Sequence, residues 1–249
     1  MMLASGIQGK SIIETAACEP HVQDLGKLLQ RMGAKINGLG THTIEIQGKE
    51  KLAGVKHSIC PDFTEAGTFF LAFALTGGEG KIKNIDTSAL TFFLEKMKDI
   101  GVNFEVKKNE IIIKKSKNFK AAKIQSLPFP GFPTDLQPQA TVLLTQAKGK
   151  SLIHDPLYEN RFSHLQELRL MGADIEITDP HRALIFGKTK LTGKNIYATD
   201  IRAGATLILA ALIAKGTTKV QNVHQIERGY EGFDEKLRKL GADIKIKNL

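Results

Sequence analysis

The sequence predicts an α/β fold built from a structural unit of about seventy residues that is repeated along the chain. Three observations support this prediction. A glycine that ends a helical pattern recurs four times, apolar residues before it are spaced as on one helix face, and alternating apolar residues follow it. Because each unit contains helices and strands, we expect the units to stack around a shared core of buried helices, with sheets outside.

The four repeated glycines are Gly33, Gly101, Gly172 and Gly241, separated by 68, 71 and 69 residues. Apolar residues at i, i+3, i+4 and i+7 precede them and form one apolar helix face. In the first copy these residues are Leu25, Leu28, Leu29 and Met32. Glycine adopts the left-handed conformation that helix ends often need, so each of the four is expected to end an amphipathic helix.

Strand patterns follow these glycines, and a second shared block precedes them. Residues 104–106 and 111–113 read as one hairpin, and residues 175–177 and 183–185 as another. Upstream, an aspartate opens a short apolar helix in three copies, at Asp62, Asp135 and Asp200. Aspartate suits an N-cap because its carboxylate accepts unpaired backbone N–H groups. A Gly-led strand is expected after each of these helices, beginning at Gly80, Gly149 and Gly216.

The first copy of the unit is shorter than the others. Only residues 2–8 precede its first strand, against the sixteen residues 200–215 in the last copy. We therefore expect the chain to begin inside a structural unit. Residues 1–60 would be the remainder of one lobe, and residues 61–249 a complete second lobe. The three repeats of that lobe would be, in order, about 61–126, 127–196 and 197–249.

Composition restricts the classes of function. The 249 residues are 42% hydrophobic and carry a formal net charge of +9, which favours an anionic partner. The charges are scattered, Trp is absent and Tyr numbers 3, so a nucleic-acid-binding surface is disfavoured against a small anionic substrate. No apolar run predicts a membrane span and no secretory signal is visible. Cys18 and Cys60 are expected as small core residues in a reducing, cytoplasmic compartment.

Four motifs carry a resemblance to a known family. They are Phe-Pro-Thr-Asp-Leu-Gln at 132–137, Tyr-Glu-Asn-Arg-Phe at 158–162, Asp-Ile-Arg-Ala at 200–203 and Glu-Arg-Gly-Tyr-Glu at 227–231. Together they resemble the UDP-N-acetylglucosamine 1-carboxyvinyltransferases of the EPSP synthase-like enolpyruvyl transferase family. The resemblance covers the C-terminal portion of that family only. It implies an inside-out α/β barrel of two three-repeat lobes, or roughly 420 residues in a whole enzyme.

The resemblance implies a reaction and an anion-binding site. The enolpyruvyl group of phosphoenolpyruvate would pass to the 3-hydroxyl of UDP-N-acetylglucosamine with release of phosphate, the first committed step of peptidoglycan precursor synthesis. No metal or organic cofactor is implied. Arg161, Arg202 and Arg228 match the family's phosphoenolpyruvate-binding arginines, and arginine suits carboxylate and phosphate because its planar fork binds them bidentately. Independently, a cation in the first turn of a helix, as at Arg202, is unfavourable unless an anion lies beside it.

The sugar side of the site is assigned to three residues. Asp135 matches the family's catalytic base and sugar-binding aspartate, although its position alone is explained equally well by an N-cap. It lies in a Pro-rich loop, 128–138, that we expect to be stiff and non-helical. Leu157 matches a position whose backbone contacts the nucleotide sugar. Tyr158 could pack against the sugar, in place of the family's more usual Phe, or could be a half-buried structural aromatic.

Several departures keep alternatives open. Phe63 stands where the family usually has an arginine. The family's N-terminal Lys-Asn pair, early arginines and mobile loop with a reactive Cys have no counterpart here, and neither Cys18 nor Cys60 is assigned that role. A separate N-terminal segment of the same enzyme is therefore a candidate partner. The alternatives are an inactive fragment that only binds nucleotide sugar, a nucleic-acid binder and a shikimate-pathway enolpyruvyl transferase.

Overall fold

The chain divides into two compact units in a computed structural model that describes residues 1–159 and 161–247. The N-terminal unit comprises residues 1–62 together with 128–131. The main unit comprises residues 63–127 and 132–249. Asn160 of the Tyr-Glu-Asn-Arg-Phe motif and the last two residues of the third predicted repeat lie outside the described residues.

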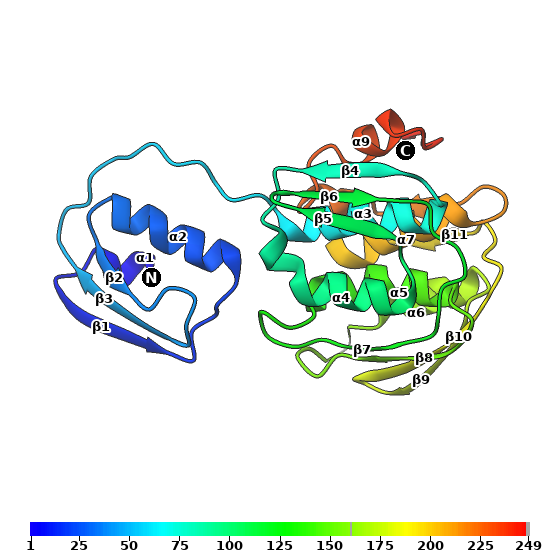
Figure 1. Cartoon of the computed structure of the whole chain (residues 1–249), viewed down its shortest axis with the longest axis horizontal. Helices are drawn as coiled ribbons and strands as arrows, with labels where there is room; N and C mark the ends of the chain where they lie inside the picture. Colours follow the sequence, from blue (N-terminus) through cyan, green and yellow to red (C-terminus); the bar gives the residue numbers. More distant parts are fainter. Residues whose placement is uncertain (160, 248–249) are drawn as a thin grey trace. The chain divides into compact units, whose positions relative to one another are not determined.

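The N-terminal unit is one small sheet with a helix (Figure 1). Strands β1, β3 and β2 pair antiparallel in that order, and Leu29 of helix α2 packs with Ile36, Ile44 and Ile46 of the strands. Its elements are α1 (Met2–Ser5), β1 (Gly9–Glu14), α2 (Pro20–Arg31), β2 (Lys35–Asn37) and β3 (Thr43–Gly48). The helix-then-hairpin order predicted around Gly33 is therefore present.

The main unit contains three further copies, of which the first two repeat this helix-then-hairpin order, and it adds a central layer of helices. The first copy consists of α3 (Phe63–Thr76), β4 (Gly80–Lys83), η1 (Thr87–Leu90), α4 (Thr91–Ile100), β5 (Phe104–Lys107) and β6 (Glu110–Ile113). The second consists of β7 (Lys123–Gln125), η2 (Thr134–Leu136), α5 (Gln137–Thr145), β8 (Gly149–His154), α6 (Ser163–Leu170), β9 (Asp174–Asp179) and β10 (Arg182–Gly187). The third consists of β11 (Asn195–Tyr197), α7 (Ile201–Ile213), β12 (Lys219–Gln221), α8 (His224–Glu227) and α9 (Phe233–Lys239).

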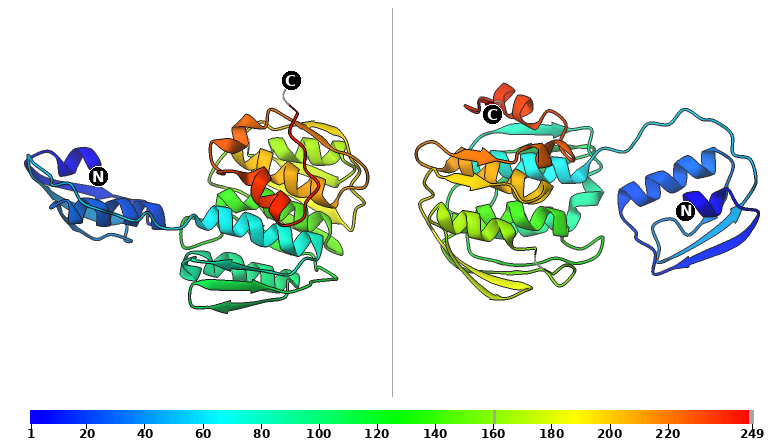
Figure 2. Two further views of the ribbon diagram at one scale, coloured as in Figure 1. Left: turned by 90° about the horizontal axis from the view of Figure 1, so that it is seen from above. Right: turned by 180° about the vertical axis from the view of Figure 1, so that it is seen from behind.

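Helices α3, α5 and α7 pack against one another in the interior, and the sheets lie outside them (Figure 2). Every residue of α5 is buried, and small residues let the helices approach closely. A side chain on Gly67 of α3, for example, would place its Cβ 2.4 Å from Leu136 Cδ1. The sheets have the orders β4-β6-β5, β7-β8-β10-β9 and β11-β12. The predicted core of buried helices is therefore confirmed.

The repeated glycines end their helices in the same way. Their φ angles are +106°, +100°, +100° and +100° in chain order, in the left-handed region. In each case the residue after the glycine donates its backbone N–H to the carbonyl five residues earlier, as Val102 does to Met97 at 2.9 Å. This six-to-one hydrogen bond is the Schellman motif, and at the first three glycines a strand follows it directly.

Four local expectations were wrong. The strand expected to begin at Gly216 begins at Lys219 instead, as β12. Residues 242–247, where a strand was expected after Gly241, form none. The Pro-rich loop becomes helical at Thr134. Pro138 is compatible with this because it lies in the first turn of α5, where a backbone N–H has no acceptor within the helix and its loss in proline costs no hydrogen bond. Cys18 is buried but Cys60 is only half-buried, because it lies in the irregular segment before α3.

The described helices also bear on the predicted absence of a membrane span. None of them is long and apolar enough to cross a membrane.

Candidate active site

Asp135 is held by two arginines from other segments. Its Oδ2 accepts a hydrogen bond from Arg202 Nη2 at 2.7 Å, and its Oδ1 accepts one from Arg161 Nη2. The three side chains are 37%, 20% and 24% exposed for Asp135, Arg202 and Arg161, so the ion pairs are partly shielded from water. The structure therefore brings together three of the predicted site residues, which lie 26 and 67 residues apart in sequence.

Local structure explains how each of these side chains reaches the cluster. Asp135 lies in the single turn η2 and makes no capping hydrogen bond, so the N-cap interpretation of this aspartate is wrong. Asp200, by contrast, caps α7 through the backbone N–H groups of Arg202 and Ala203, both at 2.8 Å. That cap fixes Arg202 in the first turn. Arg161 lies two residues before α6.

The electrostatics of the cluster keep Asp135 ionised. Burial opposes the charged carboxylate and would raise its pKa, but Arg202 and then Arg161 outweigh burial through their charges and hydrogen bonds. The pKa of Asp135 is therefore below its ordinary value. A carboxylate with a low pKa is in the deprotonated form that a base needs, but it attracts protons weakly while both arginines hold it.

Leu157 and Tyr158 lie beside the cluster on the loop between β8 and α6. The Arg161 guanidinium stacks over the Tyr158 ring at 4.9 Å from its centroid, a cation–π contact. Tyr158 is 53% exposed, so about half of its surface is open to solvent, and its contact with the nucleotide sugar stays a prediction. The Leu157 backbone N–H donates to Asp155 Oδ1 at 3.1 Å.

Arg228 has a looser connection to the cluster. Its Nη1 donates to Gln225 Oε1 at 3.1 Å, and its side chain is exposed. The next residue does approach the cluster, since a Cβ on Gly229 would lie 3.8 Å from Arg202 Nη1. The backbone next to Arg228 therefore lies near Arg202, while the Arg228 side chain bonds to Gln225.

Tyr230 supports Arg202 from the interior, a role that sequence reasoning missed. The Arg202 guanidinium lies 5.6 Å from the centroid of the Tyr230 ring. The buried Tyr230 hydroxyl pairs with Thr68 Oγ1 of α3 at 2.9 Å and with Gln139 Nε2 of α5 at 3.1 Å. Burial raises its pKa, so it stays a neutral phenol. The signal was available, because Tyr230 belongs to the Glu-Arg-Gly-Tyr-Glu motif.

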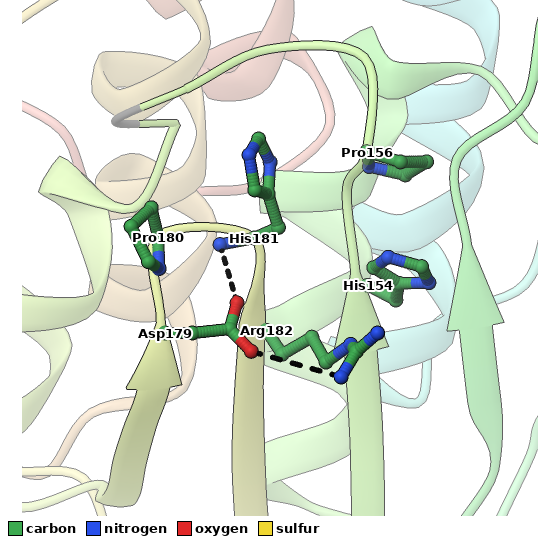
Figure 3. Close-up of a pocket in the computed structure, with 6 residues that line it drawn as sticks. All are labelled: His154, Pro156, Asp179, Pro180, His181 and Arg182. Atoms are coloured by element: carbon green, nitrogen blue, oxygen red, sulfur yellow. Dashed lines mark hydrogen bonds and ion pairs between the residues drawn. The ribbon is translucent and has the colours of Figure 1, made fainter.

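A shallow hollow of about 350 Å³ lies at the ends of strands β8, β9 and β10 (Figure 3). It is lined by His154, Pro156, Asp179, Pro180, His181 and Arg182. Asp179 Oδ1 accepts from the His181 backbone N–H at 2.8 Å, and its Oδ2 lies 3.8 Å from Arg182 Nη1. The hollow contains none of the predicted site residues.

Histidine, cysteine and carboxylate side chains form no group of three that could hold a metal ion in the part of the chain that the structure describes.

Comparison with known proteins places this chain in a family. The sequence model of EPSP synthase (3-phosphoshikimate 1-carboxyvinyltransferase) matches residues 1–237. The chain belongs to the EPSP synthase family. Among solved structures of the family fold, the enolpyruvyl transferase NikO from Streptomyces tendae superposes with a TM-score of 0.86 at 27% identity, over 98% of this chain and 58% of that one. EPSP synthase from Acinetobacter baumannii, at 19% identity and a TM-score of 0.72, shares the fold. The predicted α/β fold is confirmed.

Curated relatives that the sequence matches include UDP-N-acetylglucosamine 1-carboxyvinyltransferases. The one from Halothermothrix orenii is 47% identical over 98% of this chain, and that from Koribacter versatilis is 46% identical over 98%. The resemblance seen in the motifs is confirmed. The chain spans 59% and 56% of the lengths of these two relatives.

Proposed function

We propose that this chain provides the sugar- and phosphoenolpyruvate-binding residues of a UDP-N-acetylglucosamine 1-carboxyvinyltransferase. The observation that carries the proposal is the Asp135–Arg161–Arg202 cluster, because it combines an ionised carboxylate with two fixed cations from distant segments. Relatives at 44–47% identity that bear this name support the choice of substrate.

The cluster suits the chemistry of that reaction. The 3-hydroxyl oxygen of the sugar bonds to C2 of phosphoenolpyruvate while its proton passes to a base and C3 gains a proton. The resulting tetrahedral intermediate then loses inorganic phosphate and a C3 proton, and the enolpyruvyl ether remains. Guanidinium groups stabilise the carboxylate and phosphate charges throughout. In the proposed roles, Arg161, Arg202 and Arg228 bind these anions and Asp135 accepts the hydroxyl proton.

Ligand binding would also tune Asp135. The carboxylate and phosphate of phosphoenolpyruvate compete with Asp135 for Arg161 and Arg202. As these cations turn toward the ligand, the interactions that lower the pKa of Asp135 weaken, and burial raises it. The carboxylate then becomes a stronger base at the moment when its substrate is present.

The N-terminal region of the relatives is proposed as a partner of this chain. The family's Lys-Asn pair and mobile loop belong to the part of the relatives that the chain does not span. We therefore expect the chain alone to turn over at least a thousandfold more slowly than an intact enzyme, on the order of 4 kcal/mol of lost transition-state stabilisation.

A phosphate-release assay tests the proposal. The chain is mixed with phosphoenolpyruvate and UDP-N-acetylglucosamine, with and without the N-terminal part of the Halothermothrix orenii relative as a separate polypeptide. Release is expected only when the second polypeptide is present, and only with this acceptor. Shikimate 3-phosphate is the matched control acceptor, because the family model carries the name of an enzyme that uses it. Release with shikimate 3-phosphate but not with the sugar would refute the proposed substrate. Full activity of the chain alone would refute the partner.

A further inference from the structure

We propose that Asp155 is a positioning residue that fixes the two loops of the candidate site relative to each other. The inference rests on the proposed function, since it concerns how Asp135, Leu157 and Tyr158 are presented to a nucleotide sugar. None of the sequence motifs includes Asp155.

The first observation is the burial of a carboxylate at the junction of these loops. Asp155 follows the last residue of β8 and is 0% exposed. Its Oδ2 accepts from Ser126 Oγ at 2.9 Å and from Thr134 Oγ1 at 2.6 Å, and its Oδ1 accepts from the Leu157 backbone N–H at 3.1 Å. Removing a carboxylate from water is unfavourable unless donors replace the water, and here three donors converge on it.

The second observation is what these donors are attached to. Thr134 directly precedes Asp135, and Leu157 directly precedes Tyr158. The two oxygens of one carboxylate therefore connect the loop that presents the proposed base to the loop that presents the proposed sugar contacts. Arg161 also connects the two loops, because it forms an ion pair with Asp135 and stacks on Tyr158.

The third observation is that Asp155 is itself fixed in place. Its backbone N–H donates to the His181 carbonyl at 2.8 Å, and its carbonyl accepts from His181 Nδ1 at 2.8 Å. His181 is at the tip of the β9–β10 hairpin, and Figure 3 shows it beside the loop that leaves β8. The carboxylate thus projects from the end of β8, where the hydrogen bonds to His181 hold the backbone of Asp155 in place. A site built in this way holds its contact residues in one geometry before ligand binds.

A fluorescent reporter tests the inference without requiring activity. The chain contains no Trp, so Tyr158→Trp creates a single reporter on the loop. Asp155→Asn in this reporter chain is expected to lower the emission anisotropy and to increase quenching by acrylamide, which is uncharged. The matched control is Asp86→Asn. Asp86 also accepts from a backbone N–H and a hydroxyl, those of Ser88 at 3.0 and 2.6 Å, but it caps η1 away from the site. Asp86→Asn should leave both the anisotropy and the quenching unchanged.

A binding measurement then connects the loop to ligand. In the chain with Tyr158 intact, Asp155→Asn should weaken UDP-N-acetylglucosamine binding, measured by calorimetry, about tenfold or more, as for the loss of a charged hydrogen bond. Asp86→Asn should not. If Asp155→Asn fails to fold by circular dichroism, Thr134→Val and Ser126→Ala replace it, since each removes one donor and leaves the charge intact.

Three outcomes decide the matter. Unchanged anisotropy and quenching in the folded variants would show that Asp155 does not order the loop, and would overturn the inference. A more mobile reporter with unchanged affinity for the nucleotide sugar would overturn its functional part. If the unaltered chain binds no nucleotide sugar, the proposed function fails instead, and the reporter comparison still decides whether Asp155 orders the loop.

Discussion

At the scale of single residues, burial and charge give aspartates at corresponding repeat positions different roles. The Asp200 carboxylate accepts hydrogen bonds from two backbone N–H groups of α7. Asp135 occupies the corresponding position before α5 but turns to Arg161 and Arg202. The repeat explains why an aspartate stands before each of these two helices. The two arginines, which come from later segments of the chain, explain why the Asp135 carboxylate forms ion pairs and does not cap α5.

His164 gives a prediction about pH at this scale. It is buried in α6, and its Nε2 has no hydrogen-bond partner among the described residues. Burial lowers its pKa from 6.5 to about 3, because it outweighs the nearby charge of Asp200, which raises the pKa, and the charge of Arg161 lowers it further. The unfolded chain therefore takes up this proton first as the pH falls. The contribution of the neutral ring to stability is complete above about pH 6.5 and is lost between there and about pH 3.

Between pH 7 and pH 5, His164 alone should lower the free energy of unfolding by about 2 kcal/mol. Urea denaturation at the two pH values measures this loss. His164→Leu should reduce the difference between them by that amount, and the exposed His224→Asn should not. If wild type and His164→Leu lose stability in parallel, the buried ring is not the titrating group.

The members of the Asp135–Arg161–Arg202 cluster were predictable because the motifs contain them, while their roles in binding and catalysis stay predictions. Asp135, Arg161 and Arg202 were identified by resemblance, and Arg202 also by its unfavourable place in a helix. Asp155 was not, because the two residues whose hydroxyls donate to it, Ser126 and Thr134, lie more than twenty positions away on another loop. No spacing rule links an aspartate to hydroxyls that only the fold brings within 3 Å.

At the scale of elements, the cap of α7 has a measurable consequence. Asp200→Ala removes the acceptor for two N–H groups and should lower the free energy of unfolding by about 1 kcal/mol, within the ~0.5–2 kcal/mol usual for such caps. Asp200→Asn retains an acceptor oxygen and should lose less. Urea denaturation with an unchanged m-value would measure both. Equal losses for the two variants would contradict capping as the main role.

The helices and hairpins were predictable because their periodicities are strong and a glycine marks each transition. The predictions failed where the local signal was weak. Gly216 resembled the strand-leading Gly80 and Gly149, but Thr217 and Thr218 do not pair, and β12 begins after them. The prolines near Asp135 suggested a rigid loop, yet a proline in the first helical turn is compatible with a helix, and α5 uses it so.

At the scale of the whole molecule, the two units are built on separate cores of different size. The N-terminal unit buries a small cluster that includes Leu29, Ile44 and Ile46, while the three interior helices of the main unit are surrounded by a much larger one. Apolar side chains also remain exposed on the N-terminal unit, including Leu3 at 79% and Ile59 at 84%.

The repeats predicted a shared helical core, and the three copies of the main unit bury their apolar faces in one. The copy around Gly33 instead packs on the separate core of the N-terminal unit. The assignment of residues 128–131 to the N-terminal unit was not predictable, because it depends on contacts between segments far apart in sequence. The proposal that residues 61–249 correspond to one lobe of a two-lobe enzyme remains a prediction from the resemblance.

The account depends most directly on Asp135. We would measure phosphate release from phosphoenolpyruvate and UDP-N-acetylglucosamine by this chain, supplemented with the N-terminal part of the Halothermothrix orenii relative, and compare Asp135→Ala with the unaltered chain. The account predicts that the unaltered mixture releases phosphate, and that Asp135→Ala abolishes release and weakens nucleotide-sugar binding while the fold is retained. Equal phosphate release by the two proteins would contradict it.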